Sequence, residues 1–201
     1  MPLTAQATDW FAFRVRSRHE KLVSASLRGK GFAEFLPLSK SRHKWADRSK
    51  TVEVPLFPGY VFCDTERSEI GRIRCTPGVI DVIRAGSSPL PANRWEIEGL
   101  RTATEAQLPL ESWPYMDPST TGRVRITSGP LAGLHGVLLE VRGKERLILS
   151  VDLLRRSVLV ELPFSSIEIC ADSAGYTAGS AGRSLGYQCR GAASSRTGTE
   201  G

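Results

Sequence analysis

Residues 52–62, VEVPLFPGYVF, decide the fold of the N-terminal half. Val, Tyr and Phe are typical of β-strands, and they dominate this run. Pro55 and Pro58 interrupt it, and proline cannot donate a ladder hydrogen bond. The run therefore predicts a strand that carries aromatic side chains and has an open edge or a bulge at its prolines.

The preceding residues predict a strand, a helix and a second strand. Residues 10–16, WFAFRVR, alternate in polarity and favour a strand. Ser17 and Glu20 have the spacing of a capping box, which predicts a helix over 18–30, followed by a strand over 32–38. The residues expected on the inner face of this helix are Leu22, Val23, Ser26 and Leu27.

Three further elements complete the first domain, which we expect over residues 9–106. They are a short helix over 66–74, a strand over 79–84 and a helix over 91–106. The basic segment 39–51 lacks an apolar period, so it is a loop or the tip of an extended hairpin. The element order predicts an α+β fold in which helices pack on an antiparallel sheet.

The pattern changes after residue 106. Residues 107–121 contain three prolines and predict a linker. Five short alternating segments over 122–169 predict a small β-barrel, closed on itself to hide its strand edges. Residues 170–201 consist mainly of Gly, Ala, Ser and Thr, which predicts a disordered tail because such a segment buries little apolar surface.

Composition excludes several protein classes. The chain has 201 residues, of which 40% are hydrophobic and 24% charged, so it is not collagen, a coiled coil or globally disordered. It has no apolar run of the roughly 20 residues that a membrane helix needs. The four cysteines are irregularly spaced and are expected to be free thiols. We expect a soluble, cytoplasmic monomer.

Positive charge is concentrated near the N-terminus. The chain carries a net charge of +6, but residues 14–50 alone hold 11 Lys and Arg against three acidic residues, a local net of +8. Such a concentration attracts phosphates. An ordinary solvated surface explains the charge equally well, although the rings of His43 and Trp45 could stack on exposed bases and so favour a nucleic-acid contact.

An enzymatic function finds no support in the sequence. His19, His43 and His135 are the only histidines, and none belongs to a pattern that resembles a catalytic triad or a zinc site. A phosphate-binding Gly-x-x-x-x-Gly-Lys is absent from the sequence. We expect neither a metal nor a cofactor.

Three motifs carry a resemblance to a known family. Residues 122–137, GRVRITSGPLAGLHGV, resemble the KOW motif. Residues 55–62, PLFPGYVF, and 76–79, TPGV, resemble the N-terminal domain of NusG. Their order and spacing are similar to the NusG/RfaH family of transcription elongation factors over about residues 9–169. The segments 16–21, 45–48 and 52–62 further resemble UpxY-type antiterminators of long exopolysaccharide operons.

The resemblance implies a transcription elongation and antitermination factor that binds the clamp helices of RNA polymerase and suppresses pausing. The residues that would form the polymerase-binding face are Phe57, Pro58, Tyr60, Phe62 and Val82. One face of this strand must also fill the core, so burial of Tyr60 and Phe62 is the competing interpretation. The residues that would face upstream or non-template DNA are Arg14, Arg16, Arg18, His19, Lys21, Arg42, His43, Lys44, Trp45, Arg48 and Lys50.

The resemblance also implies a second partner for the KOW domain, either a ribosomal small-subunit protein or termination factor Rho. Leu154 stands where the family often has an aromatic residue, and Arg155 replaces a glycine, which weakens the case for Rho. The partner-binding candidates are Leu153, Leu154, Arg155 and Arg156. Core leucines beside solvated arginines remain an equal interpretation. The alternative function is that of a KOW-type RNA-binding protein of the ribosome.

Overall fold

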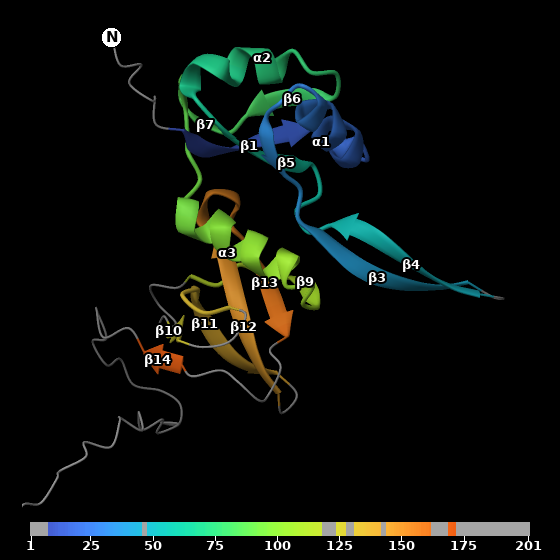
Figure 1. Cartoon of the computed structure of the whole chain (residues 1–201), viewed down its shortest axis with the longest axis vertical. Helices are drawn as coiled ribbons and strands as arrows, with labels where there is room; N and C mark the ends of the chain where they lie inside the picture. The colour runs from blue at the N-terminus through green and yellow to red at the C-terminus, as the bar shows by residue number, and fades with distance from the viewer. Residues whose placement is uncertain are drawn as a thin grey trace, which may run out of the picture.

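The structure is a computed structural model that describes residues 8–45, 48–117, 124–127, 131–141, 144–161 and 169–171. Figure 1 shows the N-terminal elements, a hairpin that projects from them, and helix α3 (Arg94–Glu105) between the N-terminal elements and a C-terminal sheet. None of the helices in the described part of the chain has the length and apolar character that crossing a membrane requires.

The N-terminal sheet has four antiparallel strands in the order β2-β5-β1-β6. These strands are β1 (Asp9–Val15), β2 (Ala33–Phe35), β5 (Tyr60–Thr65) and β6 (Val79–Val82). Helices α1 (Glu20–Gly29) and α2 (Ile70–Arg74) pack on one face, and α3 packs on the other. The predicted α+β architecture is confirmed.

Side chains along β1 alternate between the two faces of this sheet. Phe11 and Phe13 pack with Val23 of α1 and Ile73 of α2, whereas Trp10 lies in a second core on the α3 side. Because helices cover both faces, the sheet has an apolar core on each side.

The predicted strand over 52–62 is divided in two. Strand β4 (Arg48–Pro55) pairs with β3 (Leu38–Trp45), and β5 begins only at Tyr60. The intervening turn ends at Gly59, whose φ of +85° is in the left-handed region that glycine adopts without strain. The basic segment is therefore an extended hairpin, which was one of the two expected forms, and the prolines lie at the end of β4 and in the turn.

Helix α1 begins two residues later than predicted, and its predicted capping box is wrong. His19 occupies the N-cap position without a side-chain hydrogen bond to the helix. Glu20 is buried and accepts a hydrogen bond from the amide of Gly59, far along the chain. The inner face also differs: Val23 and Leu27 are buried as predicted, but Leu22 is 59% exposed.

Short elements connect the N-terminal sheet to α3. They are the 3₁₀ turn η1 (Arg67–Glu69) and strands β7 (Arg84–Ala85) and β8 (Ser88–Pro89). Asn93 caps α3 by accepting a hydrogen bond from the amide of Trp95 at 3.0 Å. Asn at this position satisfies one of the unpaired amides of the first helical turn.

The C-terminal sheet has six antiparallel strands in the order β14-β10-β11-β12-β13-β9. Its elements are β9 (Leu110–Trp113), β10 (Val124–Ile126), β11 (His135–Val141), β12 (Lys144–Val151), the 3₁₀ turn η2 (Asp152–Leu154), β13 (Arg156–Glu161) and β14 (Ile169–Ala171). This sheet resembles the expected KOW domain but differs from the predicted closed barrel of five strands. Among the described residues it has six strands, and its edge strands β14 and β9 are not paired with each other.

The sixth strand corrects a predicted boundary. Strand β9 lies inside the expected linker 107–121 and pairs with β13, so the first half of that segment belongs to the C-terminal sheet. Strand β14 extends into the first residues of the expected tail. The rest of the predicted tail, 172–201, lies outside the described residues.

Helix α3 joins the two sheets through a continuous core. Ile97 and Leu100 of α3 belong to the same buried cluster as Trp10 of β1 and Leu149 of β12. A Cβ atom at Gly99 would lie 3.6 Å from the side chain of Leu134, so the helix and the C-terminal sheet approach closely there. The expected domains are therefore in contact in this structure rather than separated by a free linker.

Candidate functional site

Four rings, which we call the aromatic layer, lie between the N-terminal sheet and α3: the buried Trp10, Phe57 and Phe62 and the half-buried Phe35. The rings of Trp10 and Phe35 meet edge to face with centroids 6.3 Å apart. Those of Phe57 and Phe62 meet in the same way at 5.7 Å. Each such pair contributes about 0.5–1.5 kcal/mol to stability beyond the effect of its buried area. The aromatic layer is therefore a rigid support for the residues at its edge.

Only part of the predicted polymerase-binding face reaches the surface. Phe57 and Phe62 are fully buried, whereas Tyr60 is half-buried and Pro58 is exposed. Val82 packs in the core with α1 and α2, on the opposite face of the sheet from Tyr60. It is therefore not part of one surface with Tyr60, and that prediction is corrected.

Three segments converge on the turn before Tyr60. The amide of Gly59 donates to Oε1 of Glu20 at 2.8 Å, and the carbonyl of Gly59 accepts from the amide of Val15 at 2.8 Å. The carbonyl of Gly78 accepts from the amide of Arg16, also at 2.8 Å. The two bonds to Gly59 fix the turn against β1 and the start of α1, and the bond to Gly78 holds the segment before β6 beside them. The role of Glu20 was missed because its spacing from Ser17 indicated a local cap instead.

The structure brings the first group of predicted basic residues to the same end of the N-terminal sheet. Arg14, which is opposite Tyr60 in the strand register, is exposed, as are Arg16 and Arg18. His19 is half-buried, and its Nδ1 lies within hydrogen-bond distance of the Ser17 carbonyl, at 3.1 Å. The exposed Arg14 is therefore the member of this group that lies beside Tyr60.

The second basic group lies on the hairpin β3–β4, which projects from the body of the molecule (Figure 1). The six residues predicted there are Arg42, His43, Lys44, Trp45, Arg48 and Lys50. The strand register places Trp45 opposite Arg48 and His43 opposite Lys50. Near the base of the hairpin, Lys21 of α1 forms an ion pair with Glu53 of β4 at 3.6 Å, which connects the two basic groups.

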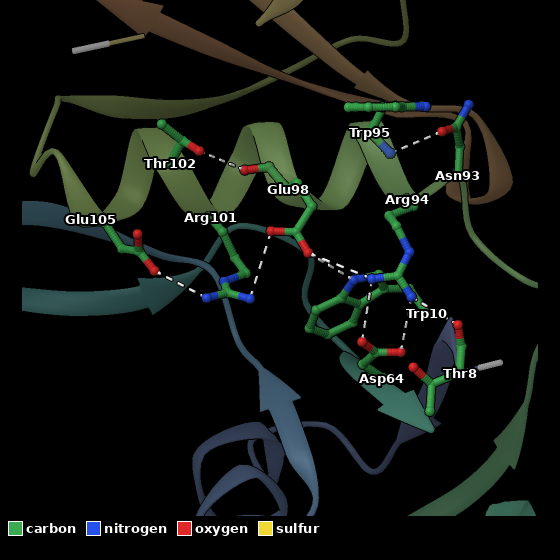
Figure 2. Close-up of polar contacts among 10 residues, drawn as sticks. All are labelled: Thr8, Trp10, Asp64, Asn93, Arg94, Trp95, Glu98, Arg101, Thr102 and Glu105. Carbon is green, nitrogen blue, oxygen red and sulfur yellow. Dashed lines mark hydrogen bonds and ion pairs between the residues drawn. The ribbon is translucent and has the colours of Figure 1, made fainter. Parts of the chain in front are cut away.

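A polar network holds α3 on the edge of the aromatic layer (Figure 2). Arg94 donates to the carbonyl of Thr8 at 2.8 Å and pairs with Asp64 of β5 at 3.4 Å. Glu98 accepts from the indole nitrogen of Trp10 at 3.3 Å and pairs with Arg101 at 3.6 Å. These contacts connect the helix to both central strands of the sheet.

The predicted partner-binding residues of the C-terminal sheet lie at turn η2 and the strand that follows it. Leu153 and Leu154 are half-buried against the shared core, and Arg156 is exposed. Arg155 has a φ of +49°, a left-handed conformation that glycine adopts without strain and other residues adopt rarely.

Arg155 is engaged within the molecule. Its guanidinium stacks on the ring of Tyr115 at 4.5 Å and pairs with Asp152 at 2.9 Å. The hydrogen bond that Tyr115 donates to Asp152, together with burial, raises the pKa of Tyr115. Both predicted arginines are exposed, but Arg156 takes no part in these contacts with Tyr115 and Asp152.

In the part of the chain that the structure describes, no three His, Cys, Asp or Glu residues are grouped so that they could hold a metal ion.

Comparison with known proteins identifies the family. Residues 8–101 match the family model described as transcription termination factor nusG. The transcription termination/antitermination protein NusG of Deinococcus radiodurans is 33% identical over 131 residues, which cover 58% of this chain and 69% of that protein. This chain belongs to the NusG family.

Other NusG proteins match a larger share of the chain. That of Halalkalibacterium halodurans is 28% identical and covers 77% of this chain and 90% of its own length. That of Pasteurella multocida is 29% identical, and the match covers 84% of this chain and 98% of that protein. A solved structure described as domain interaction in Thermotoga maritima NusG is similar at 19% identity and a TM-score of 0.48, covering 80% of this chain and 96% of that chain.

The family membership settles the class of function. NusG proteins are non-enzymatic transcription factors, and the relatives indicate a transcription termination/antitermination factor. The expected absence of an enzymatic function and the NusG resemblance are therefore confirmed. The UpxY-type resemblance stays a prediction.

Proposed function

We propose that this NusG-family protein is an antitermination factor that grips the clamp helices of RNA polymerase with the surface around Tyr60 and suppresses pausing and termination. The observation that carries the proposal is the position of Tyr60 and Pro58. They lie at the accessible margin of the aromatic layer, a few residues beyond the end of the basic hairpin. One factor can then contact protein and nucleic acid at neighbouring surfaces.

Tyr60 has the properties of an interface anchor. Tyrosine offers a large apolar ring and a polar tip, and aromatic residues dominate the energetics of interfaces. The bonds from Glu20 and Val15 to Gly59 fix the turn beneath it, so little conformational entropy is lost on binding. The buried rings of Phe57 and Phe62, which meet edge to face, support this surface from the core side.

The basic residues of the hairpin and of segment 14–21 supply the nucleic-acid contact of the proposal. Their target is upstream duplex or the displaced non-template strand. Lys and Arg contacts to phosphate position a protein without reading sequence, whereas a ring such as Trp45 or His43 can stack on an unpaired base. The projection of the hairpin from the body gives it the reach that such a contact needs (Figure 1).

The C-terminal sheet recruits the second partner in this proposal, a ribosomal small-subunit protein or Rho. Leu153, Leu154 and the exposed Arg156 supply a small apolar surface with a cation at its border. Arg155 contributes by holding turn η2 through Tyr115 and Asp152. An acidic rim on the partner would complement Arg156.

Retention of core RNA polymerase on the immobilised full chain tests the proposal. At about 0.5 M salt, where phosphate contacts are weak, the wild type retains polymerase, because the proposed contact is apolar. Tyr60→Ala loses most of the bound polymerase. Leu22→Ala, which removes another exposed apolar side chain from α1, is the matched control and binds normally.

Two outcomes would contradict the proposal. Equal retention by Tyr60→Ala and wild type would remove Tyr60 from the interface. Retention of ribosomal RNA in place of polymerase, lost at the same salt concentration, would favour the alternative of a ribosome-associated RNA-binding protein.

A further inference from the structure

A cavity of about 520 Å³ lies at the junction of α3 and the C-terminal sheet. Trp95 and Glu96 of α3 line one side, and Ala132 and Gly133, which precede β11, line the other together with Gly136 of β11. The volume is in the range of ligand and peptide side-chain sites. The cavity lies apart from the surface around Tyr60 and plays no part in the function proposed above.

Trp95 is the most exposed large apolar side chain in the described part of the chain, at 79%. Figure 2 shows it on the opposite side of α3 from Arg94 and Arg101, so it does not help to hold the helix on the N-terminal sheet. A tryptophan left in water beside a cavity is typical of a recognition site, because its ring gains much by burial.

The chain itself leads to this cavity. Strand β14 ends at Ala171, which pairs with Val124 of β10, and Val124 pairs in turn with Gly136, a residue of the cavity wall. Two strand spacings, roughly 10 Å, therefore separate Ala171 from the cavity. Residues 172–201 follow Ala171, and five extended residues span at most about 17 Å.

The composition of the following segment complements the cavity. It contains Tyr176, Arg183, Tyr187 and Arg190 within its first part. The cavity is lined by the indole ring of Trp95 and by Glu96, whose carboxylate also accepts a hydrogen bond from the amide of Asp152 at 3.2 Å. Arginine and tyrosine side chains pack on indole rings, and guanidinium groups pair with carboxylates.

We propose that residues 172–190 dock in the cavity between α3 and the C-terminal sheet, with Tyr176 as the first ring that reaches Trp95. Because the segment is tethered to β14, its effective concentration at the cavity is on the order of millimolar, so weak contacts suffice. Because the cavity walls come from both parts of the molecule, the docked segment also holds the C-terminal sheet against α3.

Nuclear magnetic resonance of the full chain tests the docking. Replacing Tyr176, Arg183 and Arg190 together by Ser shifts the indole signal of Trp95 and the amide signals of Ala132 and Gly133, while the indole signal of the buried Trp10 stays in place. Arg196→Ser, which removes one cation beyond the docking segment, is the control and shifts none of these signals. Unchanged Trp95 and Ala132 signals in the triple variant would overturn the proposal.

Disulfide trapping provides a second readout, because the native Cys189 lies in the proposed segment. In a Cys75→Ser, Cys170→Ser background, Ala132→Cys on the cavity wall crosslinks to Cys189 at least about tenfold faster than Arg125→Cys. Arg125 is also exposed and neighbours Val124, but it does not line the cavity. Equal rates at the two positions, or crosslinks that form only between two copies of the chain, would overturn the proposal.

Discussion

The buried carboxylate of Glu20 accepts a hydrogen bond from the amide of Gly59 at 2.8 Å, which ties the first turn of α1 to the turn that carries Tyr60. Glu20→Ala leaves this amide without its partner and should lower the free energy of unfolding by about 1–3 kcal/mol. Glu20→Gln keeps an oxygen acceptor and should lose less. Urea unfolding of the two variants measures the difference, and equal losses would mean that the bond contributes nothing.

Two glycines should respond to alanine in opposite directions. At Gly99 a Cβ atom meets only Leu134, at 3.6 Å, so Gly99→Ala should raise stability by roughly 0.5–1 kcal/mol because alanine favours the helix. At Gly136 a Cβ atom would lie 2.6 Å from the carbonyl oxygen of Ile148, so Gly136→Ala should cost on the order of 1–3 kcal/mol. Thermal unfolding of both variants checks the signs, and a stable Gly136→Ala would contradict the β11–β12 packing.

The hairpin should contribute salt-dependent affinity for DNA. Replacing Arg42, Lys44 and Arg48 by Ala should make the association constant for duplex DNA less dependent on salt. The magnitude of the slope of its logarithm against the logarithm of the salt concentration should fall by about 2–3, while the affinity for polymerase is unchanged. The charge-conserving variant Arg42→Lys, Lys44→Arg, Arg48→Lys is the control and should keep the slope. An equal loss of polymerase affinity in the alanine variant would show that the hairpin contacts protein instead.

Cys63 should make the fold sensitive to alkaline pH. Burial, followed by the charges of Glu34 and Asp64, raises the pKa of this thiol from 9.0 to about 12. Between these values the unfolded chain releases the proton and the folded chain keeps it, so stability falls as pH rises above 9, by up to about 1.4 kcal/mol per pH unit. The free energy of unfolding of wild type and Cys63→Ala, measured from pH 8 to 11, isolates this contribution. Parallel pH profiles would contradict it.

Patterns within one segment predicted the elements well, because burial on one face imposes a local period. WFAFRVR was correctly predicted as a strand, and Val23 and Leu27 were correctly placed inside. Leu22 was misplaced because Glu20, which a helical pattern assigns to the surface, finds its partner at Gly59. A hydrogen bond between residues so far apart leaves no local signal.

Errors at the site have the same origin. The face on which Val82 lies depends on its pairing with Phe13 and on an irregularity in the register between Arg14 and Val15. A shift of one residue moves a side chain to the opposite face of a sheet, and the sequence does not fix that shift. Strand β9 was hidden in a proline-rich segment because its partner, β13, lies more than 40 residues away.

Single-round transcription through a Rho-dependent terminator, with Rho present, tests the central claim most directly. The claim predicts that the wild-type protein increases the fraction of full-length transcripts and that Tyr60→Ala returns this fraction to the level without the factor, while Leu22→Ala acts like wild type. Unchanged readthrough with the wild type, or increased release of transcripts at the terminator, would contradict antitermination through the surface around Tyr60.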